Sequence, residues 1–275
     1  MPKYLIVNSD DYGKTPAVSY GIRHAHLNGI ITSSSCMMNL PGIEADLKLA
    51  LKETPSLGLG VHLNLTCGDP LLPAIQVPSL IDRAGAFLGR DLLATNLSNV
   101  SATEARGEWR AQISKFVSLS GRPPTHLDAH HHCAYLTPGL FSALLDTAKE
   151  FGCAIRLPIT TDQPTAAMVK QHSKLLGAIQ EFAPPLLAQS GVRHTQALYA
   201  SFYDIGATQQ TLTSILHSLS EGISEIVCHV GFSDNSGSAP YNQQSENELK
   251  VVCSAETGQL IRDLKIVLVN FNALS

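Results

Sequence analysis

One short stretch concentrates side chains that bind metal ions. Within "THLDAHHHCAY" (125–135), four histidines and one aspartate fall within the eight positions 126–133: His126, Asp128, His130, His131 and His132. Imidazole is a common metal ligand, and a carboxylate beside it often fixes its tautomer. In an extended strand His126, Asp128 and His130 share one side, whereas His131 and His132 cannot both lie there. We therefore expect part of the cluster to bind metal, the alternative being a solvated polar turn.

Two earlier segments also carry ligand-type residues. In "LIVNSDDYG", Asp10 and Asp11 follow a short apolar run, and adjacent carboxylates repel unless a cation or proton lies between them. In "LGLGVHLNLT", His62 and Asn64 are two positions apart, so both project to the same side of a strand. Each has a structural alternative, namely a turn-capping aspartate and a hydrogen-bonded core histidine.

Two polar residues interrupt apolar strands later in the chain. Arg156 in "AIRLP" needs a carboxylate partner if it is buried, and Asp10 or Asp11 is a candidate beside a purely structural ion pair. His229 ends the apolar run of "SEIVCHVGF", where a structural histidine is the alternative. The carboxyl ends of parallel strands are where active sites assemble, so we expect both residues near the metal.

An aspartate and two histidines from separate strands match the ligand set of a catalytic metal site. Such sites keep three protein ligands and leave a position for water, which becomes a nucleophile near neutral pH. A nearby carboxylate can accept its proton, and a second group such as His229 can protonate the leaving atom. This chemistry hydrolyses an amide or an ester. The sequence lacks G-x-S-x-G, H-E-x-x-H, P-loop and dinucleotide-binding patterns.

Apolar runs alternate with helical patterns along the chain, which predicts an α/β fold with a parallel sheet in one domain, residues 1–275. Strands are expected at 4–7, 30–39, 57–66, 124–128, 153–158, 224–232 and 265–270. Helices are expected at 16–28 after the N-cap Thr15, and at 43–53, 101–121, 137–151, 164–190, 208–220 and 255–264. Ser101 and Glu104 form a capping-box pattern. The irregular stretch 67–101 is predicted to be a substrate-facing loop.

Composition limits the partners and the compartment. Hydrophobic residues make up 44% of the 275 residues, which is enough for a sizeable core. A net charge of −4 argues against nucleic acid, and no run of about 18 apolar residues predicts a membrane span. The N-terminus makes a poor signal peptide, and the six cysteines show no C-x-x-C pairing, so we expect a cytoplasmic protein with reduced thiols. A homodimer is the default expectation for the assembly.

Several segments together resemble the YdjC-like carbohydrate deacetylases, which include chitooligosaccharide deacetylases. The resemblance is carried, in order, by "LIVNSDDYG", "GIITSSSCMMN", "LGVHLNLT", "GRPPTHLDAHHH", "AIRLP" and "IVCHVGF". It implies a distorted (β/α) barrel of the polysaccharide-deacetylase type and removal of the acetyl group from a small N-acetylated saccharide. It also implies one divalent metal ion held by Asp11, His62 and His130.

The resemblance implies roles for the surrounding residues as well. Asp10 would be the general base, His229 the general acid, and Arg156 the partner of the base. The adjacency of Asp10 and Asp11 leaves open which of them faces the metal. Asp128 and Asn64 would support the ligands. Relatives commonly have an arginine where this chain has Ser245, in "YNQQSENELK", which affects a substrate or subunit contact.

Two alternative functions use the same residues. The site could belong to a metal-dependent phosphoesterase or another amidohydrolase, although no cluster of Lys and Arg lies near these segments. A non-catalytic barrel that binds sugar or stores metal is the second alternative. Imidazole ligands favour Zn, Co or Ni, and the carboxylate with open water positions keeps Mg as a candidate.

Overall fold

The protein is described by a computed structural model that covers residues 2–162, 166–234 and 239–274. Its centre is a parallel sheet in the order β5-β4-β3-β2-β1-β7-β6, with β8 paired to β1 beside β2. The strands are β1 (Lys3–Tyr12), β2 (Ser33–Cys36), β3 (Gly58–Leu63), β4 (His126–Ala129), β5 (Ala154–Ile155), β6 (Ala197–Tyr199), β7 (Gly222–Cys228) and β8 (Val267–Leu268).

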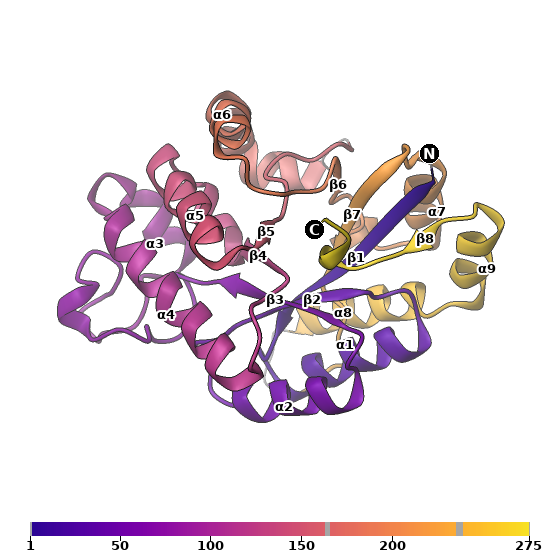
Figure 1. Cartoon of the computed structure of the whole chain (residues 1–275), viewed down its shortest axis with the longest axis horizontal. Helices are drawn as coiled ribbons and strands as arrows, with labels where there is room; N and C mark the ends of the chain where they lie inside the picture. Colours follow the sequence, from indigo (N-terminus) through magenta and orange to yellow (C-terminus); the bar gives the residue numbers. More distant parts are fainter. Residues whose placement is uncertain (1, 163–165, 235–238, 275) are drawn as a thin grey trace.

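The sheet curls until its two edges nearly meet. Ile155 of β5 forms a parallel bridge with His194, just before β6, and its N–H donates to the carbonyl of Arg193 over 2.9 Å. The result is a half-barrel surrounded by helices (Figure 1). The predicted α/β fold with a distorted parallel barrel is confirmed.

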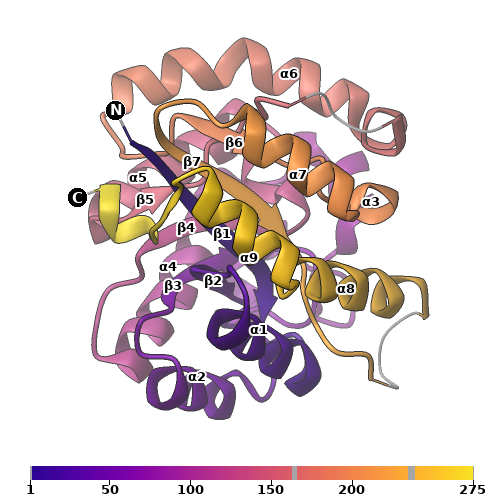
Figure 2. The same cartoon turned by 90° about the vertical axis from the view of Figure 1, so that its right-hand side faces the viewer.

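Helices cover the outside of the half-barrel. They are α1 (Pro16–Asn28), α2 (Ile43–Glu53), α3 (Gly89–Thr95), α4 (Ala102–Ser120), α5 (Pro138–Phe151), α6 (Ala166–Ser190), α7 (Gln209–Ser218), α8 (Ala239–Val252) and α9 (Ala255–Asp263). On one side α1, α8, α9 and α7 form a continuous layer (Figure 2). None of the helices in the described ranges is long and apolar enough to cross a membrane.

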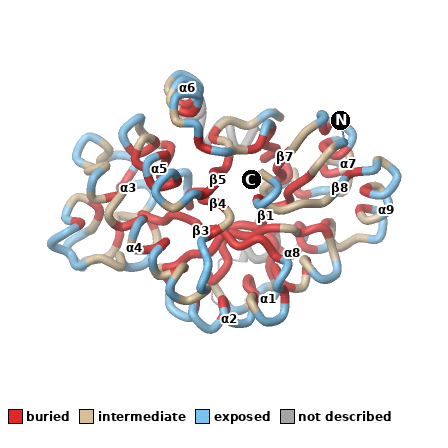
Figure 3. Tube along the Cα trace, in the orientation of Figure 1, coloured by how far each residue is buried: buried red, intermediate tan, exposed pale blue. Residues whose placement is uncertain are grey.

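Helix starts follow the capping rules. Thr15, Ser101, Thr137, Thr208 and Ser254 each accept a hydrogen bond from a backbone N–H in the first helical turn, which satisfies a donor that the helix itself cannot. The buried faces of the helices and both faces of the strands make the core, so buried chain concentrates in the centre (Figure 3).

The predicted capping box at α4 is only half formed. Ser101 accepts the Glu104 N–H as expected, but the Glu104 carboxylate binds the backbone N–H and hydroxyl of Ser79 at 2.8 Å. One turn later the buried carboxylate of Glu108 accepts N–H groups of Leu71 and Leu72. The long irregular stretch is therefore fastened to α4 by two carboxylates.

Several strands are shorter than predicted. The strand expected at 124–128 is β4, which ends at Ala129, and the one expected at 153–158 is reduced to β5. Likewise β7 ends at Cys228. His130, Arg156 and His229 thus lie just beyond strand ends rather than within strands. The elements α3, β6 and α8 are additions to the predicted set.

Candidate metal centre and active site

A β-bulge brings Asp10 and Asp11 to the same site. The register between β1 and β2 advances by three residues from Ser9 to Tyr12 but by only two from Ser34 to Cys36, so β1 carries one extra residue. Asp11 takes up the bend with a left-handed φ of 71°, which an aspartate tolerates better than most residues. Adjacent side chains that would alternate in a regular strand therefore both reach the pocket.

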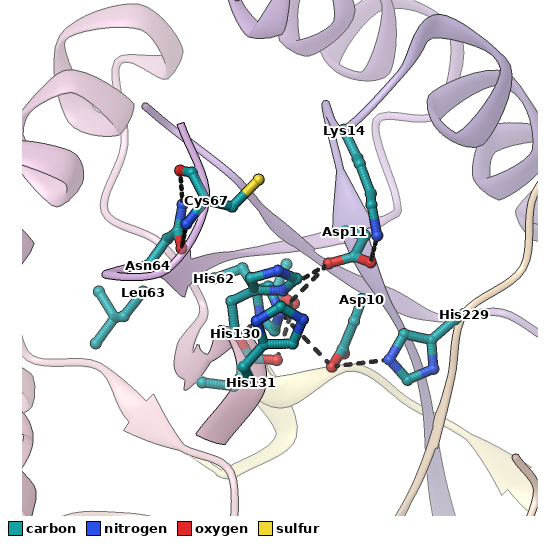
Figure 4. A network of polar contacts seen from close by, with 12 residues as sticks. Asp10, Asp11, Lys14, His62, Leu63, Asn64, Cys67, His130, His131 and His229 are labelled. Atoms are coloured by element: carbon teal, nitrogen blue, oxygen red, sulfur yellow. Dashed lines mark hydrogen bonds and ion pairs between the residues drawn. The ribbon is translucent and has the colours of Figure 1, made fainter. Parts of the chain in front are cut away.

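Asp11, His62 and His130 form a compact donor set at the carboxyl ends of β1, β3 and β4 (Figure 4). Asp11 Oδ1 lies 3.1 Å from His130 Nδ1 and 3.5 Å from His62 Nε2. Ligands of a tetrahedral cation with bonds of about 2.0–2.1 Å lie about 3.3 Å apart, so this spacing fits one divalent ion. All three residues are buried, and their donor atoms lie within 4.8 Å of one another.

His62 is oriented by a carboxylate on the neighbouring strand. It is the register partner of Asp128 between β3 and β4, and its Nδ1 lies 2.7 Å from Asp128 Oδ1, which leaves Nε2 for the donor set. Ser35 Oγ donates to the other oxygen of Asp128 over 2.8 Å. Burial alone would lower the pKa of His62, but Asp128 and Asp10 raise it to about 9.

His130 leaves the strand direction at a strained turn. Its two successors, His131 and His132, both have left-handed backbone angles, with φ of 50° and 58°. The ring of His131 lies against that of His130, with centroids 3.9 Å apart and planes tilted by 31°, and its Nδ1 lies 3.1 Å from Thr66 Oγ1. Burial lowers the pKa of His131 to about 3, so this ring is neutral.

Asn64 supports the loop after β3. Its carbonyl oxygen accepts the N–H groups of Thr66 and Cys67, and its amide donates to Asn39 and to the carbonyl of Cys67. Asn64 therefore holds the loop that carries Thr66, which in turn contacts His131. Its predicted support of the ligands is indirect in this geometry.

Arg156 binds three carboxylates with its guanidinium. Nη1 and Nη2 donate to both oxygens of Asp10 at 2.8 and 2.6 Å, and Nη2 lies 2.9 Å from Asp128 Oδ2. Nε donates to Glu225 over 2.7 Å. Burial alone would lower the pKa of Arg156, but Asp10, Glu225 and Asp128 hold it well above its usual range.

Glu225 was not identified from the sequence. It shares its side of β7 with Val227 and His229 because strand residues alternate, and it is fully buried. The signal that could have found it is a lone acid four residues before a histidine in an apolar strand. Burial raises the pKa of Glu225 to about 7 although Arg156 opposes this.

His229 faces Asp10 from the opposite side of the pocket. Its Nε2 lies 3.9 Å from Asp10 Oδ2, and its ring is in edge contact with Tyr203. Its backbone N–H donates to the buried carboxylate of Glu248 in α8, which also accepts from Gln244. Burial lowers the pKa of His229, and burial raises that of Glu248 to about 8.

The donor set opens into a pocket of about 320 Å³. One wall is apolar and is formed by Leu157, Pro158, Ile179, Leu198 and Val227. Polar and charged side chains line the rest, among them Lys14, whose Nζ lies 2.9 Å from Asp11 Oδ2. Burial alone would raise the pKa of Asp11, but Lys14, His130 and His62 hold it well below its usual range.

His126 shares β4 with Asp128, two residues apart, but it is a core residue and lies outside the donor set. Its ring stacks on Phe271 with centroids 3.8 Å apart, and it packs against the backbone of Gly60. It is fully buried, and burial lowers its pKa to about 4. The residue lies at the opposite end of β4 from the donor set.

Ser245, where the resemblance led us to expect an arginine, is buried. Its carbonyl accepts the N–H of Gly231 over 3.3 Å, in the loop that follows His229. In this chain the position therefore packs α8 against the active-site loop.

Comparisons with known proteins agree with this architecture. The profile of the YdjC-like protein family matches residues 4–263. A carbohydrate deacetylase of Brevibacillus brevis is 35% identical over an alignment of 275 positions that covers 98% of this chain and 99% of the relative. A chitooligosaccharide deacetylase of Yersinia enterocolitica is 33% identical over 269 residues, 96% of each chain.

A solved crystal structure shows the same fold. It is that of an Enterococcus faecalis V583 protein named as a candidate cellobiose-phosphate cleavage protein, with 31% identity, a TM-score of 0.83 and full coverage of both chains. The profile match and the relatives each extend over nearly the whole sequence. This chain belongs to the YdjC-like protein family.

Proposed function

We propose that this protein is a metal-dependent carbohydrate deacetylase that hydrolyses the N-acetyl group of a small N-acetylated saccharide and releases acetate. The observation that carries the proposal is the donor set of Asp11, His62 and His130 beside the Asp10–Arg156 pair. The names of the Brevibacillus and Yersinia relatives support the substrate class.

The metal ion would be held by Asp11, His62 and His130. When bound, it would supply Lewis-acid chemistry, polarising the acetyl carbonyl and lowering the pKa of water. Two imidazoles favour Zn, Co or Ni, and the carboxylate keeps Mg as a candidate. Asp128 fixes the tautomer of His62 so that Nε2 faces the site.

Asp10 would be the general base. Its Oδ2 lies 3.9 Å from both His62 Nε2 and His229 Nε2, so the carboxylate stands between the donor set and the histidine opposite. Both of its oxygens accept from Arg156, which fixes the carboxylate plane. A carboxylate oriented at this point can take the proton of the attacking water.

His229 would protonate the departing amine. Burial lowers the pKa of His229, so its protonated form is a stronger acid than free imidazolium and gives up its proton readily. The N–H contact to Glu248 holds the loop that presents the ring. The apolar wall around Val227 would take the acetyl methyl and one face of a sugar ring.

The test is acetate release from N,N′-diacetylchitobiose by protein stripped with a chelator and reloaded with Zn, Co, Ni or Mg. We expect stripping to abolish release and at least one metal to restore it. Asp10→Asn should bind the metal as the wild type does yet lose at least about 100-fold in kcat, because general-base catalysis contributes about 10²–10⁴-fold.

A substrate panel separates this proposal from its rivals. Phosphate release from phosphate esters, without acetate release from any N-acetylated sugar, would make the protein a phosphoesterase. Saccharide binding that Asp10→Asn leaves intact, with no turnover by any metal-loaded form, would make it a binding protein. Acetate release by a metal-free His62→Ala, His130→Ala variant would refute the metal-dependent mechanism.

A further inference from the structure

The three carboxylates around Arg156 do not all lie at the pocket. Asp10 lines the pocket, and Asp128 holds a residue of the donor set. Glu225 does neither: it lies deeper along β7, fully buried, and binds the guanidinium through Nε over 2.7 Å. The proposed reaction thus assigns no role to a buried carboxylate two residues away from the pocket-lining Val227.

The point of attachment matters because a guanidinium is planar. Its Nε–H and Nη–H bonds lie in one plane, so a partner on Nε fixes the direction in which the terminal nitrogens point. Those nitrogens carry the bidentate contact to Asp10 and the contact to Asp128. The bond to Glu225 therefore sets the plane in which Arg156 presents its remaining donors.

Neutralisation of Arg156 does not require Glu225. Asp10 and Asp128 already place two buried carboxylates against one guanidinium, and a third adds a desolvation cost without a second cation. That cost is visible in the raised pKa of Glu225, about 7. Glu225 adds a desolvation cost and contacts neither the donor set nor the pocket. We therefore look for its role in the geometry of Arg156.

We propose that Glu225 is a positioning residue that fixes the plane of the Arg156 guanidinium and thereby the orientation of the Asp10 carboxylate. The catalytic consequence rests on the proposed function, because it assumes that Asp10 acts as the base. The positioning itself concerns only the orientation of Arg156.

The test compares Glu225→Leu with the conservative Glu225→Gln, whose amide oxygen still accepts from Arg156 Nε. In Glu225→Leu the guanidinium can turn, so the Asp10 carboxylate can move out of its orientation. We expect kcat for acetate release to fall by about 10–100-fold, because small misplacements of catalytic groups cost this much. KM should stay within about twofold of the wild-type value. Glu225→Gln should keep kcat within about threefold of wild type. Equal losses in both variants, or no loss in Glu225→Leu, would overturn the proposal.

A spectroscopic measurement judges the positioning without turnover. The ¹H–¹⁵N signal of Arg156 Nε, assigned by its disappearance in Arg156→Lys, should exchange slowly with solvent in wild type and Glu225→Gln and faster in Glu225→Leu. Unchanged exchange in Glu225→Leu would overturn the proposal. If the wild type released no acetate, the proposed function would fail while this comparison still decided the role of Glu225.

A matched control separates positioning from loss of stability. Thr257 is fully buried in the first turn of α9, where its hydroxyl donates to the carbonyl of Val251 and accepts from Gln209, and it does not line the pocket. Thr257→Val should lower the melting temperature while keeping kcat at temperatures below the transition. An equal loss of kcat in Thr257→Val would show that destabilisation alone explains the Glu225→Leu effect and would overturn the proposal.

Discussion

His126 belongs to the histidine-rich stretch, but we expect it to affect stability instead of metal binding. Its burial should make the folded protein sensitive to acid. Its ring is fully buried between Phe271 and the backbone of Gly60, and burial lowers its pKa from 6.5 to about 4. Replacement by phenylalanine keeps an aromatic ring on Phe271 and removes the titrating group. The substitution therefore isolates the contribution of this one imidazole to the pH dependence of stability.

The sign follows from proton uptake. Above pH 6.5 the imidazole is neutral in the folded and the unfolded chain, and its contribution to stability is fully present. As the pH falls towards 4, the unfolded chain binds a proton that the folded chain excludes, so stability is lost until the folded form also takes up the proton. The pKa of His126 is lowered from 6.5 to about 4, and each pKa unit corresponds to about 1.4 kcal/mol, so the stability lost on acidification is about 3 kcal/mol.

The assay is urea-induced unfolding of chelator-treated wild type and His126→Phe at several pH values between 7 and 4. We expect the free energy of unfolding of the wild type to fall by about 3 kcal/mol more than that of the variant over this range. Altered packing in the variant changes its free energy of unfolding by the same amount at every pH, so this change does not affect the difference in pH dependence. Parallel curves for the two proteins would refute the assignment of His126 to the core. Loss of metal binding in His126→Phe, the result expected for His130→Ala, would refute it as well.

Three further predictions concern neighbouring residues. Gly60→Ala places a Cβ against the ring of His126 and should destabilise the fold by about 1–3 kcal/mol, measured by urea unfolding; an unchanged midpoint would contradict the packing described. His229→Ala should lower kcat by about 100-fold with metal affinity unchanged by calorimetry, because the ring would donate a proton without binding the ion. Thr66→Val removes the hydroxyl beside His131 Nδ1 and should weaken Co²⁺ binding by about 2–10-fold; equal affinity would show that His131 needs no such support.

The sequence was sufficient to predict that residues far apart in the chain lie close together in the fold. A chain that alternates strands and helices builds a parallel sheet, whose strand ends share one rim, so Asp11, His62 and His130 could be expected to lie together. The structure places them within one donor set. Their roles as metal ligands remain predictions until an ion is measured.

Local patterns were less informative where the elements are short or polar. Strand β6 has only three residues, and it is held by neighbours such as β7 rather than by its own periodicity. Helix α8 is rich in Gln, Asn and Glu, so its sequence lacks the apolar stripe that predicts an amphipathic helix. Its Glu248 nevertheless accepts the backbone N–H of His229. Tertiary contacts define both elements, and a single sequence does not display those contacts.

Arg156 shows a second limit. A charge inside an apolar strand implies a partner, and Asp10 was one of two candidates named for it. The number of partners depends on the curvature of the sheet, which brings carboxylates of β4 and β7 to the same guanidinium. Glu225 is 69 residues away in sequence, and only the curled sheet makes it a neighbour.

The choice between Asp10 and Asp11 turns on one inserted residue. In a regular strand the two would face opposite sides, and only one could reach the pocket. The bulge in β1 adds a residue against β2, and the left-handed φ of Asp11 directs its carboxylate to His130 and His62 while Asp10 stays against Arg156. Because a bulge is set by pairing with the neighbouring strand, adjacency in the sequence could not show which carboxylate faces the two histidines and which faces Arg156, whereas the strand register does.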